Sequence, residues 1–393
     1  MASSCGPNSL LSATARDNDQ ENKVSKFIDD TMQSIMDEFM KSGGRPTITL
    51  RRRSSQSSYT LNMQTGALQT NVLGPLCSYA WPGKSMQEAW RFAVTMRILG
   101  HISDAIHGNF TTSKRDIYYT DPACFGSQKV VDAFVDDIAF TIGVDRTALH
   151  VVAAAKGLMA GSYKIMLKNN SSVDVGSAVD GMLIPRIETI EQVYLSGVRW
   201  ILVIEKEAVF HRLATSNYHK ASAAGNGILI TGKGYPDLNT RAFLRLLSTP
   251  RNSPPIYILV DSDPDGIAIM STYKYGSVAQ LHENANLNVP TLEWLGLRAS
   301  DTGCCGSGGG ATNTNTMGGG DEALIPLTLR DRKKARAMLE RSPVFAEDGP
   351  ERRWRTELQH MLMVNVKAEI EVLYEREGGI ERWLDRSLLE MAW

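Results

Sequence analysis

The stretch "PPIYILVDSDPDGIAIMSTYKYG", residues 254–276, decides the fold of this chain. Its apolar run at 256–260 is short and ends at a polar residue, which is typical of a buried strand. A helix is expected after Pro264, so the stretch predicts a strand, a turn and a helix in that order. Asp261 and Asp263 lie in the turn, directly after the strand.

Two earlier stretches repeat this pattern. "VRWILVIEKEAVFHRL" predicts a buried strand at 198–204 that breaks at Glu205 and continues into a helix. "GNGILITGKGYPDLNTRAFLRLL" predicts a strand at 227–231, a glycine-rich turn and a helix from about Asn239. Three strand–turn–helix units in series predict an α/β fold, in which a parallel sheet carries helices on its faces.

The carboxyl ends of these strands are the expected site of chemistry. Glu205, Asp261 and Asp263 all fall there. Three carboxylates brought together repel one another and lose hydration unless a cation lies between them, so we predict an oxygen-liganded ion, Mg²⁺. A calcium loop of the EF-hand type would need glutamate at its twelfth position, where Thr272 stands. A haloacid-type phosphotransferase would also place Asp-x-Asp after a strand but would not need Glu205.

Composition limits the function classes. With 393 residues, of which 42% are apolar, the chain is long enough for two packed domains. We expect no membrane span and no secretion, because no apolar run reaches about 18 residues and the first residues do not resemble a signal peptide. The net charge of -1 argues against a protein that coats nucleic acid but permits a local basic groove. The cysteines match no zinc spacing and favour a reducing compartment; they are Cys5, Cys77, Cys124, Cys304 and Cys305.

The N-terminal region differs from the rest in composition. Residues 1–23 are polar and are expected to be disordered. Residues 24–84 are expected to hold one helix, within "VSKFIDDTMQSIMDEFMKSGG", followed by a flexible segment that is basic and rich in serine. The apolar face of that helix fits either a partner protein or the chain's own core, and the sequence leaves both open.

Residues 85–175 predict a separate helical domain. A capping box at Ser85 opens one helix, and a second runs from about Gln128 to Gly143. The following stretch "HVVAAAKGLMAGSYKIML" has apolar runs on both sides of a Lys-Gly turn. This order favours a winged helix-turn-helix domain, with Lys156 at the tip of the wing, although a plain packing role fits the same apolar pattern.

Two tyrosines stand together in "KRDIYYTDPACFGSQ", residues 114–128. They are Tyr118 and Tyr119, and the sequence alone permits either core packing or a nucleophile. Arg115 precedes Tyr119 by one helical turn and can stand on the same face. A surface ion pair with Asp116 or Asp121 is the alternative role for this arginine.

The remainder of the chain, residues 190–393, is expected to be one domain with the parallel sheet, an insertion at 301–321 and closing helices at its C-terminus. The insertion is rich in glycine. A glycine-rich loop can cradle phosphate, but this one lacks a preceding strand and an immediately following helix, so a flexible surface insertion is favoured.

A glutamate after one strand, followed two strands later by D-x-D-x-x-G, is similar to the signature of a Toprim domain, a Rossmann-like parallel-sheet domain. With "RDIYYTDPACFGSQ" upstream of a winged-helix (CAP-like) pattern, the chain closely resembles the A subunit of type IIB DNA topoisomerases (topoisomerase VI). Within that group it resembles the eukaryotic meiotic transesterases, which make the double-strand breaks that initiate recombination. The resemblance covers about residues 85–300 and resumes at "LIPLTLRDRKKARAMLE".

The resemblance implies roles for individual residues. Tyr119 matches the nucleophile that forms a 5′-phosphotyrosyl link, and Tyr118 would pack behind it. A free phenol has a pKa of about 10, so it needs help near neutral pH, which Arg115 could give to the phenolate or to the scissile phosphate. Glu205, Asp261 and Asp263 would hold Mg²⁺. The residues expected to contact DNA, each of which also fits an ordinary surface role, are Lys156, Lys233 and Tyr235.

The resemblance also implies partners and a place of action. The substrate would be double-stranded DNA, and a double-strand break would need a homodimer with active sites shared between protomers. Meiotic accessory proteins and a separate B-type subunit would assist in the nucleus, on chromosomes. Two rival functions stay open: a Toprim hydrolase or primase-like enzyme, which would not use Tyr119, and a DNA-binding homologue that does not cleave.

Overall fold

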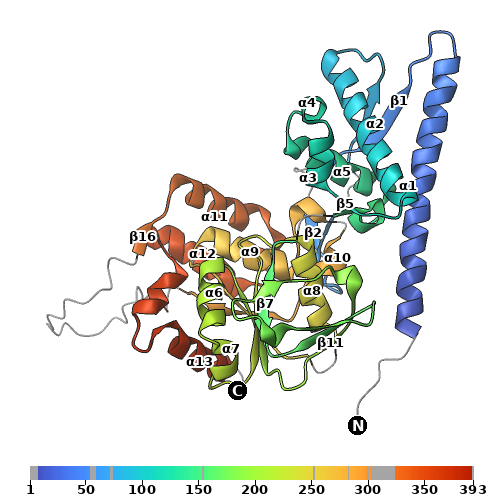
Figure 1. Ribbon diagram of the computed structural model, residues 1–393. Helices are drawn as coiled ribbons and strands as arrows, with labels where there is room; N and C mark the ends of the chain where they lie inside the picture. Colours follow the sequence, from blue (N-terminus) through green and yellow to red (C-terminus); the bar gives the residue numbers. More distant parts are fainter. Residues whose placement is uncertain are drawn as a thin grey trace. The chain divides into compact units, whose positions relative to one another are not determined.

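The structure is a computed structural model that describes residues 8–53, 59–70, 74–152, 155–250, 253–281, 283–298, 301 and 324–391. The chain forms two compact units. Unit 1 comprises residues 1–58 and 70–154, and unit 2 comprises residues 59–69 and 155–393. Figure 1 shows the elements of both units. No helix in the described ranges has the length and apolar character that a membrane span requires.

Unit 1 is mainly helical. Its elements are α1 (Asn8–Met40), β1 (Thr47–Arg51), β4 (Leu76–Ala80), α2 (Met86–His107), β5 (Thr112–Ser113), α3 (Lys114–Thr120), α4 (Pro122–Phe125), α5 (Gln128–Ile142), η1 (Arg146–Leu149) and β6 (Val151–Val152). Strands β1 and β4 pair in antiparallel fashion, and the short strands β5 and β6 pair in parallel. The helices predicted after Ser85 and from Gln128 to Gly143 are confirmed as α2 and α5.

Helix α1 differs from the prediction for the N-terminus. Disorder was expected through residue 23, but α1 begins at Asn8. Its middle turns contact residues far along the chain: Gln20 exchanges two hydrogen bonds with Asp145, and Glu21 contacts His150 at 2.9 Å. The apolar face of α1 packs on the unit's own core through its buried residues, which are Val24, Ile28 and Ile35.

Unit 2 is built on a six-stranded sheet in the order β10-β7-β13-β12-β14-β15. The strands β12 (Trp200–Ile204), β13 (Gly227–Thr231), β14 (Ile256–Leu259) and β15 (Leu292–Gly296) are parallel, whereas β7 (Leu158–Gly161) and β10 (Met182–Leu183) are added in antiparallel fashion. The three predicted strand–turn–helix units are confirmed, because α6 (Glu207–Thr215), α8 (Leu238–Ser248) and α9 (Pro264–Lys274) follow β12, β13 and β14.

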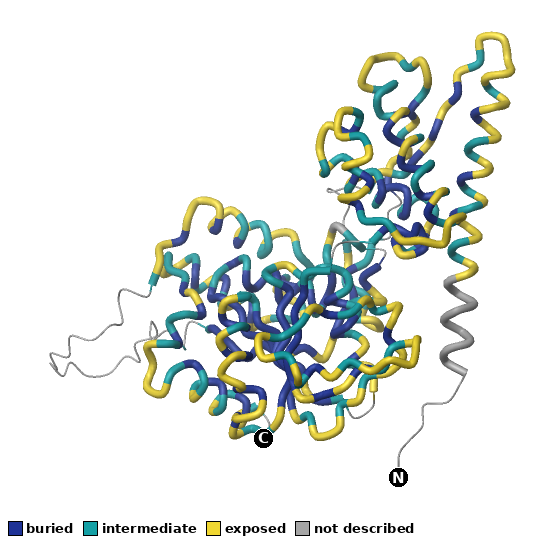
Figure 2. Tube along the Cα trace, in the orientation of Figure 1, coloured by how far each residue is buried: buried dark blue, intermediate teal, exposed yellow. Residues whose placement is uncertain are grey.

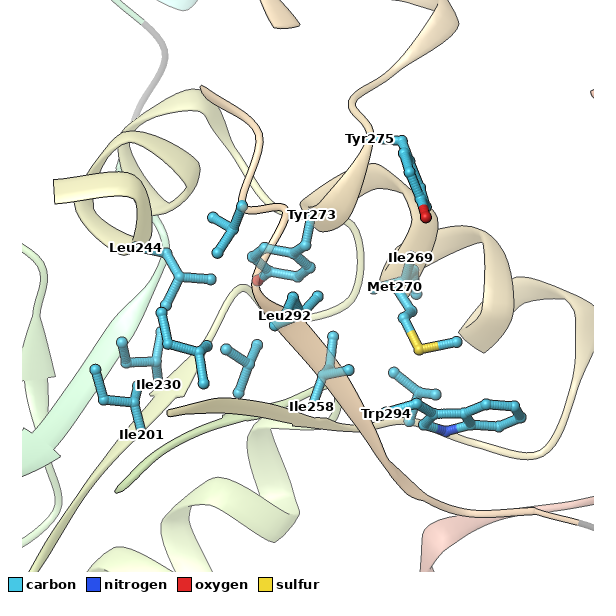
Figure 3. Close-up of a cluster of buried hydrophobic side chains, with 14 of the residues drawn as sticks. Ile201, Ile230, Leu244, Ile258, Ile269, Met270, Tyr273, Tyr275, Leu292 and Trp294 are labelled. Atoms are coloured by element: carbon cyan, nitrogen blue, oxygen red, sulfur yellow. The ribbon is translucent and has the colours of Figure 1, made fainter. Parts of the chain in front are cut away.

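Both faces of this sheet are buried. Along β12, Ile201 and Val203 face a core that includes residues of α8 and α9, while Leu202 faces a second core that includes residues of α6 and α13. Figure 3 shows Ile201 and Ile258 on the strand side of the first core, with Leu244 of α8 among the helix residues. In Figure 2 the inner segments of this unit are mostly dark blue, and much of its exterior is yellow. Each fully buried side chain of this size contributes about 1.5–3 kcal/mol.

The remaining elements of unit 2 surround this sheet. They are β2 (Tyr59–Leu61), β3 (Leu68–Thr70), β8 (Lys164–Leu167), β9 (Ser172–Asp174), η2 (Val175–Ser177), η3 (Ile187–Thr189), β11 (Ile190–Tyr194), α7 (Tyr218–Ala221), η4 (Val278–Gln280), α10 (Asn284–Leu287), β16 (Leu324–Pro326), α11 (Leu329–Arg341), η6 (Pro343–Phe345), α12 (Arg352–Val364), β17 (Val366–Ala368), η7 (Ile370–Glu375) and α13 (Gly379–Met391). Most of the glycine-rich run, with Cys304 and Cys305, lies outside the described residues.

The residues predicted to form the wing do not belong to the helical unit. Strand β7 lies between β10 and β13 of the unit 2 sheet, and β8 belongs to a three-stranded sheet with β11 and β9. All four residues of β7 are buried, which an exposed wing would not permit. The helical unit therefore ends near residue 154 rather than at 175, and Lys156 belongs to unit 2.

Candidate active site

Helix α3 of unit 1 carries the tyrosine pair. Its N-terminus is fixed by a capping box, in which the Asp116 amide donates to Ser113 Oγ at 3.0 Å and the Ser113 amide donates to Asp116 Oδ2 at 2.9 Å. Near its C-terminus, Thr120 Oγ1 lies 3.0 Å from His101 Nε2 of α2. Hydrogen bonds on both sides of the tyrosines therefore fix helix α3, by its own capping box at one end and by a side-chain contact with α2 at the other.

The two tyrosines have different surroundings. Tyr118 is partly buried and packs against the core of unit 1, whereas Tyr119 is 65% exposed. Their ring centroids are 5.3 Å apart with an interplanar angle of 58°. Exposure of the second ring is unusual for a core aromatic residue and leaves its hydroxyl accessible to a large substrate.

Arg115 lies on the exposed surface of α3. The two carboxylates that could have paired with it are engaged elsewhere, since Asp116 caps the helix and Asp121 contacts Arg97 at 3.4 Å. Within the described residues no ion pair to Arg115 is formed. The alternative prediction for this arginine, a surface ion pair with Asp116 or Asp121, is therefore not met in the described part of the chain.

The three predicted carboxylates lie at the carboxyl ends of β12 and β14. The backbone amide of Asp261 donates to Glu205 Oε2 at 2.9 Å. Asp261 Oδ1 accepts from the amide of Ile370 at 2.9 Å. Asp263 caps helix α9, where its Oδ1 accepts from the Gly266 amide at 2.6 Å.

One oxygen of each carboxylate is thus anchored by a backbone amide. The other oxygen of Glu205, Asp261 and Asp263 accepts no hydrogen bond from the residues that the structure describes. Each side chain has therefore a fixed orientation and an uncommitted oxygen. Carboxylates held in this way are suited to an oxygen-liganded divalent cation.

Electrostatics at this edge also favour a bound cation. Burial, together with the neighbouring charge of Asp261, raises the pKa of Glu205 to about 8. Burial raises the pKa of Asp261 to about 6, although the Lys206 ammonium opposes this rise. Burial raises the pKa of Asp263 as well. A cation among these groups would favour their charged forms.

The carboxylates are neighbours but not a closed ligand set. Nowhere in the described parts of the chain are three side chains of the metal-binding types gathered into a ready-made site. A Toprim domain generally binds divalent metal ions, and the donor oxygens found here fit such an ion. The identity of the ion as Mg²⁺ stays a prediction.

Sequence reasoning missed several residues at this edge. Lys206 Nζ lies 2.6 Å from Glu371 Oε2, 3.0 Å from Glu369 Oε2 and 3.3 Å from Asp261 Oδ1. Lys206 directly follows Glu205, and this was the only available signal. The two glutamates lie in the C-terminal part where closing helices are expected, but α12 ends at Val364, β17 follows, and Glu371 lies in the short 3-10 helix η7.

The residues predicted to contact DNA gather at the same edge of the unit 2 sheet. Lys156 Nζ donates to the Lys233 carbonyl oxygen at 3.2 Å, and Lys233 Nζ lies 2.8 Å from Glu207 Oε1. The hydroxyl of Tyr235 donates to Asp265 and also contacts the Lys334 ammonium. Gly234, in the same turn, donates its amide to the carbonyl oxygen of Glu205 at 2.9 Å. The structure therefore places these residues beside the carboxylates, but does not place Lys156 on a wing.

Comparison with known families assigns both units. The family model for the Toprim domain of Spo11 and the topoisomerase 6 A subunit matches residues 200–381, and the model "Type IIB DNA topoisomerase" matches residues 90–151. These matches and the sheet define the chain as a topoisomerase-like enzyme of type IIB with a Toprim domain.

Curated relatives cover most of the chain. The mouse "Meiotic recombination protein SPO11" is 33% identical over 345 residues, which are 87% of this chain and 82% of the mouse protein. "Meiotic recombination protein SPO11-1" of Arabidopsis thaliana is 32% identical over 353 residues, 90% of each chain. The DNA topoisomerase 6 A subunit of Arabidopsis thaliana is 33% identical over 294 residues, 74% of this chain and 64% of that protein. The chain belongs to the family of Spo11 proteins and topoisomerase 6 A subunits.

Proposed function

We propose that this chain cleaves double-stranded DNA by transesterification, with Tyr119 as the nucleophile, and thereby initiates meiotic recombination. The observation that carries this proposal is the 65% exposure of Tyr119 on a capped helix, beside a partly buried Tyr118. The names of the relatives, which include meiotic recombination proteins and topoisomerase 6 subunits, support the reaction class.

The reaction exchanges one phosphate ester for another. The phenolic oxygen of Tyr119 attacks a DNA backbone phosphate and loses its proton, the bond from phosphorus to the 3′ oxygen breaks, and that oxygen leaves and takes up a proton. A 5′-phosphotyrosyl link remains. Because the number of ester bonds is unchanged, the step needs no ATP. Arg115 stabilises negative charge on the phenolate or phosphate from the same helix face.

Glu205, Asp261 and Asp263 would hold Mg²⁺ through their uncommitted oxygens. When bound, this ion would neutralise charge that develops on the phosphate and the leaving oxygen. The role of the chain's own residues is to orient the carboxylates, which backbone amides do for all three.

DNA contacts are assigned to both units. In unit 1, α2, α3 and α5 would form the helical part of a winged-helix DNA-binding domain. In unit 2, Lys156 and Lys233 would contact backbone phosphates and Tyr235 a sugar or base. These three residues lie at the sheet edge that carries the carboxylates, so their contacts would position DNA at the site.

The active enzyme would be a homodimer, because one tyrosine cuts one strand and a double-strand break needs two. Each active site would combine Tyr119 of one protomer with the carboxylates of the other. Meiotic accessory proteins and a B-type subunit would join this dimer on chromosomes in the nucleus. The relatives' names, which refer to meiotic recombination, support the meiotic setting of this proposal.

The test asks for the covalent product. Wild-type protein, isolated from cells in meiosis under denaturing conditions, should carry short DNA attached to Tyr119. Tyr119→Phe should abolish this label, whereas Tyr118→Phe, which keeps the packed ring, should retain it. A nuclease activity that survives Tyr119→Phe would point to a Toprim hydrolase, and wild-type protein without attached DNA would point to a homologue that does not cleave. Loss of the label in Tyr118→Phe alone would move the nucleophile to the first tyrosine.

A further inference from the structure

A C-terminal segment of unit 2 is attached to the loop that carries Asp261. We call residues 366–371 the clamp segment. Ser262 and Ala368 exchange two backbone hydrogen bonds, of 2.9 Å and 3.2 Å. The amide of Ile370, two residues later, donates to Asp261 Oδ1 at 2.9 Å. The clamp segment therefore determines which oxygen of Asp261 is engaged and which is left.

Lys206 joins the clamp segment to the same oxygen. Its ammonium contacts Glu371 Oε2 at 2.6 Å and Glu369 Oε2 at 3.0 Å, both on the clamp segment. It also lies 3.3 Å from Asp261 Oδ1. The lysine side chain is 23% exposed, whereas Glu369 and Glu371 are 54% and 39% exposed. Lys206 is thus in contact with two glutamates that lie more than 160 positions away from it in the sequence.

We propose that Lys206 and Glu371 form an ion pair that holds the clamp segment on Asp261, so that Asp261 presents its second oxygen to a divalent cation. Lys206 is thus a positioning residue. This inference rests on the metal site of the proposed function. Groups that orient a metal ligand typically change metal affinity by about 10–100-fold when they are removed.

Simple electrostatics makes a different prediction. If Lys206 acted only as a positive charge near the site, its removal would strengthen cation binding, and removal of the negative charge of Glu371 would weaken it. If the two act together as a tether, removal of either one loosens Ile370 from Asp261, and both changes weaken cation binding. The signs of the two effects therefore separate these explanations.

The experiment measures Mg²⁺ binding to the full chain by isothermal titration calorimetry. Lys206→Met and Glu371→Gln should each weaken binding by about tenfold, and the double variant should be no weaker than either single variant. Lys206→Arg, which keeps the charge, should restore most of the affinity. Lys274→Met is the matched control, because Lys274 is similarly buried and paired with Glu351 at 2.7 Å, but lies at the far end of α9.

Hydrogen exchange tests the tether without metal. In metal-free protein, Lys206→Met should speed exchange of the Ile370 amide at least severalfold, while Lys274→Met should leave it unchanged. Unchanged Ile370 exchange, or tighter Mg²⁺ binding by Lys206→Met, would overturn the inference. The metal site itself would be overturned if wild-type protein did not bind Mg²⁺, or if Asp261→Asn still bound it. In that case the hydrogen-exchange rate of Ile370 still tests whether Lys206 holds the clamp segment on Asp261.

Discussion

At the scale of single residues, each position of the D-x-D-x-x-G motif has a separate physical role. Asp261 follows the end of β14 by two residues and accepts the amide hydrogen bond of Ile370, and Asp263 caps α9. Glycine is required at position 266 because there is no room for a side chain there, and not because of its backbone dihedral angles. A Cβ atom at this position would lie 2.4 Å from the carbonyl oxygen of Asp261, which is backbone and cannot move aside without displacing the carboxylate.

Gly266→Ala should therefore destabilise unit 2 by about 1–3 kcal/mol, the usual cost of forcing extra volume into a packed site. Thermal unfolding would measure this loss. The matched control is Gly100→Ala in α2, where an added Cβ meets nothing within 4 Å. That variant should gain about 0.5–1 kcal/mol, because alanine favours a helix. Equal melting temperatures for Gly266→Ala and the wild type would show that the first turn of α9 can adjust.

The sequence predicted the carboxylates but not their supporting residues, and separation along the chain explains the difference. Asp261 and Asp263 stand in one turn after a recognisable strand, and Glu205 ends another strand in the same way. The partners of Lys206 are 163 and 165 residues away. No local pattern can reveal such a pairing, so the tether became visible only in the folded chain.

At the scale of elements, the strand–turn–helix units were predictable because their signals are local. The predicted strand at 227–231 coincides with β13, and the other two differ from β12 and β14 by one or two residues. The prediction that the residues around Lys156 form a wing was wrong for a tertiary reason. Apolar runs around a Lys-Gly turn predict strands, but they do not determine whether those strands pack on helices or pair with β13.

The attachment of the tyrosine helix depends on a buried ion cluster between α3 and α5. Asp136 Oδ1 contacts Lys114 at 2.6 Å and Arg146 at 3.2 Å, and its Oδ2 contacts Arg53 at 3.0 Å. Asp136→Asn would leave the buried Lys114 and Arg146 without their shared carboxylate, so we expect a loss of about 3–5 kcal/mol in unit 1. Urea titrations read out by hydrogen-exchange labelling of α5 peptides would measure it.

The stability difference between the wild type and Asp136→Asn should depend on pH. Burial alone would raise the pKa of Asp136, but Lys114, Arg146 and Arg53 bring it below the ordinary value of 3.8. Its stabilising contribution is therefore complete above that ordinary value and is lost as the pH falls through the lower pKa of the folded state. The difference between wild type and Asp136→Asn should shrink only below about pH 4.

Asp132→Asn provides the control for this cluster. Asp132 lies on the same helix but contacts Lys114 only at 3.9 Å and is 43% exposed, so its removal should cost less than about 1 kcal/mol. A loss for Asp136→Asn no larger than that of Asp132→Asn would show that α3 is held by its apolar contacts instead.

At the scale of the whole molecule, the two halves of the proposed reaction belong to different units. Tyr119 lies in unit 1, which has its own core, and the three carboxylates lie in unit 2, with cores on both faces of its sheet. Single-chain sequence patterns predict each half separately, because each half is built from short local motifs. They do not show whether one protomer supplies both halves of an active site.

Mixing two inactive variants would answer this question. Tyr119→Phe lacks the nucleophile and Asp261→Asn lacks a carboxylate, so each homodimer should be inactive. If active sites are shared between protomers, the mixed dimer combines both lesions in one site and leaves the other site with an intact tyrosine and intact carboxylates. We therefore expect the mixture to form the covalent link on one strand only, which denaturing gels of labelled DNA would detect as nicks.

The stoichiometry of the mixture makes this expectation quantitative. At equal amounts and free exchange of protomers, about half of the dimers are mixed, and each carries one competent site, so covalent product should reach roughly a quarter of the wild-type level. The double variant mixed with wild type is the control: its mixed dimer places one lesion in each site and should be inactive. If instead each protomer used its own carboxylates, the two single variants would not complement each other, and the mixture of double variant and wild type would retain nicking.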